Sequence, residues 1–143
     1  MHKPRRLLVL ATAVALAGLG PAALAVDSTP AAADKLAAAR NLVKAEQWRA
    51  AIAELQTVND TGSADWNNLM GFAQRKASPP DLAAAERHYD AALRIDPKHR
   101  GALEYSGELY LMKGELPKAE ERLKALDRLC FLPCEEYTDL KEA

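Results

Sequence analysis

Cys130 and Cys134 are the residues whose type and spacing most clearly point to reactive chemistry. They flank a predicted helix break, where their Cα atoms can approach to the few ångströms that a disulfide requires. Three interpretations are open: a disulfide that fixes the last helix against the preceding one, a redox or metal-binding pair, or two free thiols. The redox interpretation rests on Cys134, which lies at a predicted helix N-terminus that stabilises a thiolate. The spacing matches neither a thioredoxin-type pair nor a haem-attachment motif.

The other polar residues do not form a pattern that predicts catalysis. His88 is expected on the outer, solvated face of a helix and His99 in a turn, so no metal site is predicted. Nucleophile elbows, phosphate-binding glycine loops and zinc-protease motifs are absent from the sequence. The acidic pairs at 120–121 and 135–136 are expected to be solvated, with nothing to raise their pKa. The sequence therefore predicts no catalytic residue, no metal and no cofactor, and the protein is not expected to be an enzyme.

Composition narrows the class of protein further. The chain has 143 residues and a net charge of −1, with 49% hydrophobic, 27% charged and 6% aromatic residues. That length supports one domain. A near-neutral charge provides no basic excess to displace phosphate counterions, and few aromatic residues are present to stack on bases. Nucleic acid is therefore not an expected partner.

The first 25 residues have the pattern of a secretory signal peptide. A cationic start precedes an apolar stretch from Leu7 to Gly20, which is 14 residues long. A bilayer span requires about 20 residues, so stable membrane insertion is not expected after cleavage. Small residues at Ala23 and Ala25 predict cleavage after Ala25. We expect residues 26–31 to form a flexible leader and the protein to be periplasmic or secreted, where a disulfide is favoured.

The remaining chain is predicted to be helical throughout, because apolar residues recur at helical spacing. The turn between Asn59 and Ser63, the Pro79-Pro80 pair, Asp96-Pro97 and Lys113-Gly114 separate the helices. Ser63 or Asp65 is expected to cap the third helix. Six helices are predicted over residues 32–44, 47–58, 65–77, 81–95, 99–112 and 116–129, and a last short helix begins near Pro133. In the sixth helix the side chains expected to face inward are Leu116, Ala119, Leu123 and Leu126.

An internal repeat relates these helices. Ala51, Ala85 and Ala119 are 34 residues apart, and each follows an apolar residue by three positions and precedes a bulky one by four. Gly71 and Gly107 occupy the middle of two other helices, where small residues are expected because helix axes approach closely. The 34-residue period is that of the tetratricopeptide repeat. Residues 32–129 resemble this family.

The resemblance implies an all-α fold in which antiparallel helical hairpins stack as a short solenoid. About three repeats are expected in residues 32–129, and residues 130–143 are expected to form a disulfide-linked C-terminal capping helix. Each hairpin leaves an apolar face that only a neighbouring hairpin can bury.

The same resemblance assigns a partner-binding groove. In this family the first helix of each repeat lines the concave face. Matching positions place the following residues there: Asn68, Phe72, Arg75, Glu104, Tyr105, Glu108 and Met112. Glu104 and Glu108 stand where the family's carboxylate clamp has groups that hold a peptide C-terminus. A basic or partly apolar segment is therefore the expected ligand.

Three hypotheses for function follow. The first is an exported scaffold that mediates protein–protein or peptide binding, in the assembly of an envelope complex, without catalysis of its own. The alternative is a small periplasmic thiol-redox or metal-handling protein that uses Cys130 and Cys134. A third hypothesis is a homo-oligomer that stacks through its end repeats.

Overall fold

The computed structural model describes residues 34–143, and within this range the chain forms seven helices and no strand. The predicted signal peptide (1–25) and leader (26–31) lie outside the described residues. The all-α fold class predicted from the sequence is confirmed. The helices are α1 (Ala37–Lys44), α2 (Trp48–Val58), α3 (Ala64–Lys76), α4 (Leu82–Ile95), α5 (Arg100–Met112), α6 (Leu116–Leu129) and α7 (Glu135–Glu142).

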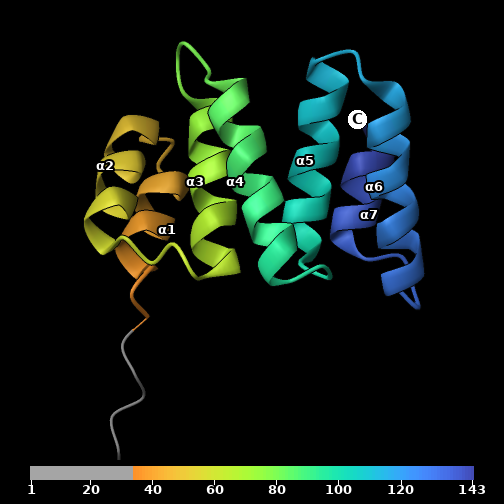
Figure 1. Cartoon of the computed structure of the whole chain (residues 1–143), viewed down its shortest axis with the longest axis horizontal. Coiled ribbons are helices and arrows are strands. Elements are labelled where there is room, and N and C mark those ends of the chain that lie inside the picture. The colour runs from red at the N-terminus through yellow and green to blue at the C-terminus, as the bar shows by residue number, and fades with distance from the viewer. Residues whose placement is uncertain (1–33) are drawn as a thin grey trace, which may run out of the picture. The chain divides into compact units, whose positions relative to one another are not determined.

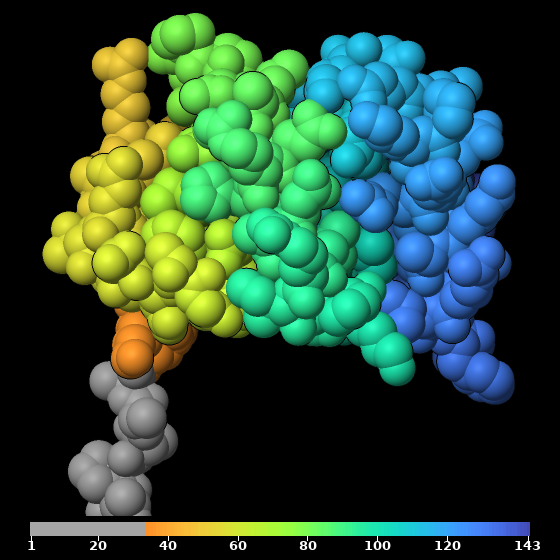
Figure 2. Space-filling view, viewed as in Figure 1, coloured from red at the N-terminus to blue at the C-terminus, as the bar shows by residue number. Residues whose placement is uncertain are grey.

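The helices pack as hairpins in chain order. α1 pairs with α2, α3 with α4, and α5 with α6, while α7 packs against both α5 and α6. The α3–α4 hairpin lies between the other two in Figure 1, and side chains fill the spaces between successive hairpins in Figure 2. The described residues are therefore a short stack of three hairpins followed by a capping helix, as the sequence predicts. None of the helices in residues 34–143 has both the length and the apolar character needed to cross a membrane.

Side chains cap three of the helices at the residues where the sequence places their ends. The Ser63 hydroxyl accepts the amide N–H of Trp66 (3.2 Å), and Asp81 accepts that of Ala84 (2.9 Å). Nδ1 of His99 accepts the first-turn amide of α5 at 3.0 Å. These bonds satisfy amide donors that have no partner inside the helix. Ser63 is thus the cap of α3, and His99, expected only in a turn, caps α5.

The first helix is shorter than predicted. It was expected from residue 32, but α1 begins at Ala37. A carboxylate oxygen of Asp34 accepts the amide N–H of Leu36 at 3.0 Å, and the Asp34 carbonyl accepts that of Ala37 at 3.1 Å. Aspartate side chains that bond nearby amides offer the backbone an alternative to the helix. This local turn therefore delays the start of α1.

The turns that close the first and third hairpins share one geometry. Glu46 and Gly114, two repeat periods apart, both have positive φ, at 55° and 73°. In both turns this residue's amide donates to the carbonyl three positions back, at Val43 or Leu111, with the same length of 3.0 Å. Glycine adopts this left-handed conformation freely, whereas a residue with a Cβ is strained there. The first repeat therefore keeps the turn although it lacks the glycine.

Close approach of helices occurs at both mid-helix glycines. A Cβ added at Gly71 would lie 2.8 Å from the ring of Tyr89 in α4. A Cβ added at Gly107 would lie 2.5 Å from a methyl group of Leu140 in α7. Both glycines therefore leave space for a side chain of a neighbouring helix, and at Gly107 that helix is α7.

Most of the buried apolar side chains of the described residues form three clusters. The first lies among α1, α2 and α3, the second among α4, α5 and α6, and the third among α5, α6 and α7. Their members are Leu36, Ala39, Leu55, Trp66 and Met70; Ala85, Tyr89, Leu109, Tyr110 and Ala119; and Leu103, Leu126 and Leu140. The third cluster shows that α7 completes the core of the last hairpin.

The expectation that Leu116 faces inward is wrong, because this side chain is 56% exposed. Leu116 occupies the same repeat position as Trp48 and Leu82. Trp48 packs against Phe72 of the following hairpin, and Leu82 packs against the second core cluster. In the corresponding place beside Leu116 lies α7, which has only eight residues and leaves this leucine uncovered.

Candidate partner-binding surface

A row of aromatic side chains crosses three helices. The rings of Phe72 in α3 and Tyr105 in α5 are tilted against each other with centroids 4.6 Å apart. The Trp48 ring of α2 meets Phe72 edge-on at 5.8 Å. All three side chains are half-buried, so each presents part of its ring to solvent. Partly exposed aromatic rings of this kind are enriched at protein interfaces.

Arg75 holds this row together. Its guanidinium carbon lies 5.4 Å from the Phe72 ring centroid and 5.7 Å from that of Tyr105, within the range of a cation–π interaction. The same guanidinium forms an ion pair with Glu108. Its Nη1 donates weakly to the sulfur of Met112, 3.9 Å away. Arg75 is buried, and the ion pair with Glu108 offsets its charge.

The seven residues predicted for the groove fall into two groups. The first group surrounds Arg75 on α3 and α5 and comprises Phe72, Arg75, Tyr105, Glu108 and Met112. The second group is Asn68 and Glu104, which line a separate pocket together with α7. Tyr105 borders both groups. Sequence reasoning missed Trp48 as a member of the aromatic row, although its repeat position predicts contact with the following hairpin.

The pocket around Asn68 and Glu104 is strongly acidic. It has a volume of about 200 Å³. Its lining residues come from α3, α5 and α7 and are Asn68, Gly101, Glu104, Tyr105, Glu135, Glu136 and Asp139. Glu135 and Glu136 were expected on a solvated helix surface, and Asp139 was not among the predicted site residues. Nothing in the sequence of the last helix shows which of its faces meets α5.

The pKa of Glu104 is raised to about 8, first by burial and then by the negative charges of Glu108, Asp139 and Glu136. The opposing charge of Arg75 acts in the other direction, but this arginine is engaged by Glu108. Glu104 is therefore mainly protonated at neutral pH. The pKa of Tyr105 rises to about 12, first because of burial and then because of Glu104 and Glu108. Neither effect was predicted from the sequence.

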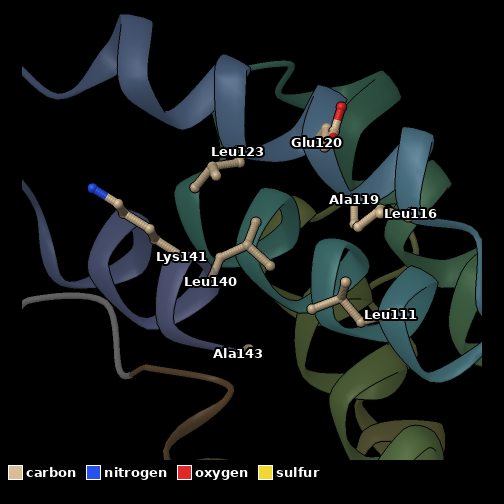
Figure 3. A pocket seen from close by; sticks show the side chains of 8 residues that line it. All are labelled: Leu111, Leu116, Ala119, Glu120, Leu123, Leu140, Lys141 and Ala143. Carbon is tan, nitrogen blue, oxygen red and sulfur yellow. The ribbon is translucent and has the colours of Figure 1, made fainter.

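A second hollow, which is apolar, lies among α5, α6 and α7 and has a volume of about 260 Å³. In Figure 3 the side chains of Leu111, Leu123 and Leu140 come from these three helices and surround it, while the charged ends of Glu120 and Lys141 point outward. Exposed Leu116 also lines this hollow.

The two cysteines lie between α6 and α7. Their sulfur atoms are 2.06 Å apart, which is the length of a disulfide, and their Cα atoms are 5.7 Å apart. Between them, Phe131 is fully exposed and Leu132 is largely exposed. The covalent link joins the end of α6 to the residue that precedes α7.

The histidines are more constrained than the sequence suggested. His88 was expected on a solvated face but is half-buried, with its ring edge-on to Trp66 at 5.6 Å. Its Nδ1 lies 3.1 Å from Oδ1 of Asn67, and burial lowers the pKa of His88. The packing of α4 against α3, which periodicity alone does not give, is the reason for the difference. In residues 34–143 no group of three or more histidine, cysteine or acidic side chains is arranged to hold a metal ion.

His99 links two consecutive repeats. Its Nε2 lies 2.9 Å from a carboxylate oxygen of Asp65, which is one repeat period earlier in the chain. This hydrogen bond is the main reason that the pKa of Asp65 is lowered, and Arg40 beside the same carboxylate acts in the same direction. His99 is thus a structural residue that ties α5 to α3.

A comparison with protein-family models gives a match in the C-terminal part of this stack. Residues 80–129, which contain α4, α5 and α6, match a family model described as Tetratricopeptide repeat. A comparison with curated proteins gives no significant match. The matched segment includes Gly107 and two of the three alanines that define the 34-residue period.

Proposed function

We propose that the protein is a scaffold that binds another protein or a peptide, because residues 80–129 match the tetratricopeptide repeat model. The proposed binding surface is the face of α3 and α5 around Arg75, and the scaffold has no catalysis of its own. The observation that carries this proposal is the half-exposed aromatic row of Trp48, Phe72 and Tyr105, which Arg75 and Glu108 hold in place.

The chemistry of this surface favours a partly apolar partner segment. Aromatic rings provide large contact areas at a low cost in side-chain entropy and are often the anchors of protein interfaces. Met112, 54% exposed beside Arg75, extends the apolar area. Methionine adapts its shape readily to different partners. The ion pair inside the cluster fixes the rings before the partner arrives, which reduces the ordering cost of binding.

Site-specific photo-crosslinking tests the surface. A photoreactive amino acid at Met112 reports on the proposed face, and the same amino acid at Leu116 is a matched control, because the two side chains are 54% and 56% exposed. We expect one defined partner to be captured from position 112 in the expressing cells, and not from position 116. Equal capture at both positions would contradict the assignment.

A second variant separates binding from folding. Phe72→Ser in the chain carrying the crosslinker at position 112 removes the centre of the aromatic row. Capture should fall at least fivefold while the helical content measured by circular dichroism stays unchanged. If capture persists in a folded variant, the aromatic row is not the binding surface.

The export part of the proposal rests on the N-terminal sequence pattern and requires its own test. We propose that the protein is cleaved after Ala25 and acts in the periplasm or outside the cell, in the assembly of an envelope complex. N-terminal sequencing of protein from the periplasm or medium should begin at Val26. Recovery of uncleaved chain in the membrane fraction alone would contradict this part.

The thiol-redox alternative depends on Cys130 and Cys134, whose sulfur atoms are at disulfide distance. Thiol trapping of protein taken directly from cells separates it from the scaffold proposal. A permanently oxidised pair, with partner capture unchanged on Cys130→Ser and Cys134→Ser substitution, supports the scaffold. A pair that is found reduced in cells, or stoichiometric bound metal, supports the alternative.

A further inference from the structure

A short loop at the end of α6 exposes two large apolar side chains to solvent. Phe131 is fully exposed and Leu132 is 73% exposed, and both lie inside the ring that the Cys130–Cys134 disulfide closes. A covalent ring restricts the backbone, so the side chains are held outward before any contact forms, which lowers the ordering cost of binding. Contiguous exposed apolar side chains mark interaction sites more often than single ones do. The loop therefore has the character of one half of an interface.

The apolar hollow among α5, α6 and α7 has a matching character. Leu116 on its edge is 56% exposed, and its walls include Leu123 and Leu140 (Figure 3). An apolar cavity of roughly 150 Å³ accommodates benzene. The hollow, at about 260 Å³, therefore has room for a phenyl ring. The loop of the same chain does not fill it, because Phe131 is fully exposed and α6, about 20 Å long, separates this ring from Leu116.

The loop and the hollow lie along one face of the last two helices. On α6, Leu116 and Leu123 line the hollow, and Asp127 lines a smaller recess beside the loop. On α7, Lys141 lines the hollow and Tyr137 lines the recess. Positions four or seven apart share a face of a helix. We call this surface, which runs from the loop to the hollow, the α6–α7 face.

The α6–α7 face carries exposed charges of opposite sign near its two ends. Asp127 lies at the loop end and Lys141 at the hollow end. The ion pairs that α6 and α7 form within residues 34–143 use other side chains, among them Glu120 on the hollow rim, which pairs with Lys124 at 3.9 Å. A two-fold axis across the middle of the face brings the loop end of one copy to the hollow end of a second copy. Asp127 then meets Lys141 of the other copy, and the charges are complementary.

We propose that two copies of this chain associate through the α6–α7 face, with Phe131 and Leu132 of each copy inserted into the apolar hollow of the other. A two-fold symmetric contact uses the same surface twice and closes as a dimer instead of growing into a filament. The inserted loop covers Leu116, which the helices of its own chain leave exposed. The dimer does not use the residues around Arg75, so this proposal is independent of the scaffold function.

Analytical ultracentrifugation measures the association. Protein recovered from the expressing cells, with its disulfide intact, should change from monomer to dimer with a dissociation constant on the order of 10 µM. Phe131→Ser and Leu116→Ser should each weaken association about tenfold, because they remove an apolar anchor and an edge of the hollow. Ile95→Ser is the matched control, since Ile95 is also exposed (46%) but ends α4. A monomer at all concentrations, a mass that grows past the dimer, or an equal effect of the control would overturn the proposal.

A charge exchange tests the relative orientation of the two copies. Asp127→Lys and Lys141→Asp should each weaken association about fivefold at low salt, because each variant brings two like charges together. The double variant carries the pair in reverse and should recover most of the affinity. If the two losses add in the double variant, these residues do not face each other and the reciprocal arrangement is wrong.

Crosslinking identifies what the loop contacts. A photoreactive amino acid at position 131 in ¹⁵N-labelled protein, mixed with unlabelled protein, should form isotopically mixed crosslinks to the residues that line the hollow. At position 116, the crosslink should be to a second copy of this chain and not to the partner captured from position 112. A monomer that binds vesicles of phosphatidylethanolamine and phosphatidylglycerol through Phe131, or a loop that crosslinks only to another protein, would overturn the proposal. If position 112 captures no partner but the mixed crosslinks form, the scaffold proposal fails and the dimer stands.

Discussion

Leu140 of α7 occupies the space that the missing side chain of Gly107 leaves open in α5. A Cβ at Gly107 would lie 2.5 Å and 2.7 Å from the two methyl groups of Leu140, which is itself buried. A residue with no side chain in mid-helix costs about 1 kcal/mol relative to alanine. The contact with α7 offsets this cost, because Leu140 completes the third core cluster with Leu103 and Leu126.

Gly107→Leu should therefore displace α7 and destabilise the last hairpin. We expect the free energy of unfolding to fall by about 2 to 3 kcal/mol, through overpacking and the loss of Leu140 burial. Chemical denaturation measures the change, and hydrogen exchange should quicken first in the amides of α7. Gly62→Ala is the control, because nothing lies within 4 Å of a Cβ built there. Wild-type melting of Gly107→Leu would contradict the packing of α7 against α5.

Glu46→Gly should stabilise the protein. Glu46 has a φ of 55° in the turn where the third repeat has Gly114, and glycine removes the Cβ that makes this conformation costly. We expect the free energy of unfolding to rise by about 1 kcal/mol, measured by urea denaturation. Gln47→Gly is the matched control in the same turn. Its φ is −86°, so glycine there should lower stability. A gain from both substitutions would show that conformational strain at Glu46 is not the cause.

Glu104→Gln should make stability less dependent on pH. The pKa of Glu104 is about 8 in the folded protein, above its ordinary value of 4.5, so the folded state binds the proton more tightly. The stability that Glu104 provides is complete below its unfolded pKa and is lost as pH rises toward 8. We expect the variant and the wild type to be equally stable at pH 4, and the variant to be more stable by about 1 to 2 kcal/mol at pH 9.

Thermal denaturation from pH 4 to pH 9 measures this difference. Glu121→Gln, which removes an exposed carboxylate from α6, should follow the wild-type pH profile. A constant offset between Glu104→Gln and the wild type at all pH values would indicate a packing effect, and the interpretation through burial of a charge would be wrong.

Removal of the disulfide should loosen α7 without melting the first two hairpins. Cys130 and Cys134 close a loop of five residues, for which chain entropy predicts a loss of about 2 kcal/mol on Cys→Ser substitution. Hydrogen exchange should quicken in residues 135–142 and remain slow in α3 and α4. Unchanged exchange in α7 would mean that Leu140 and its neighbours alone hold this helix.

The sequence predicts most of the fold, because the signals that define it are local or periodic. The turns at Pro79-Pro80, Asp96-Pro97 and Lys113-Gly114 place helix ends within one or two residues. The alanines at 51, 85 and 119 give the repeat, and all three are buried. Asp34 is an exception, because its turn depends on a side-chain hydrogen bond that competes with the helical pattern.

The candidate site was only partly predictable. The repeat register places Phe72, Arg75 and Tyr105 on the first helices of neighbouring hairpins, where they meet. The acidic pocket depends on α7, which lies outside the period of the repeat. No spacing rule therefore shows that Asp139 approaches Glu104, or that Leu116 lacks a cover.

The uncovered position beside Leu116 makes this stack a candidate for modular engineering. The contact of Trp48 with the hairpin after it, and the packing of Leu82 on the second core cluster, indicate what an added hairpin must supply. A designed 34-residue hairpin inserted between α6 and α7 should bury Leu116. In the longer stack, α7 would cap the added hairpin. The interaction surface would grow by one helix without any change to the residues around Arg75.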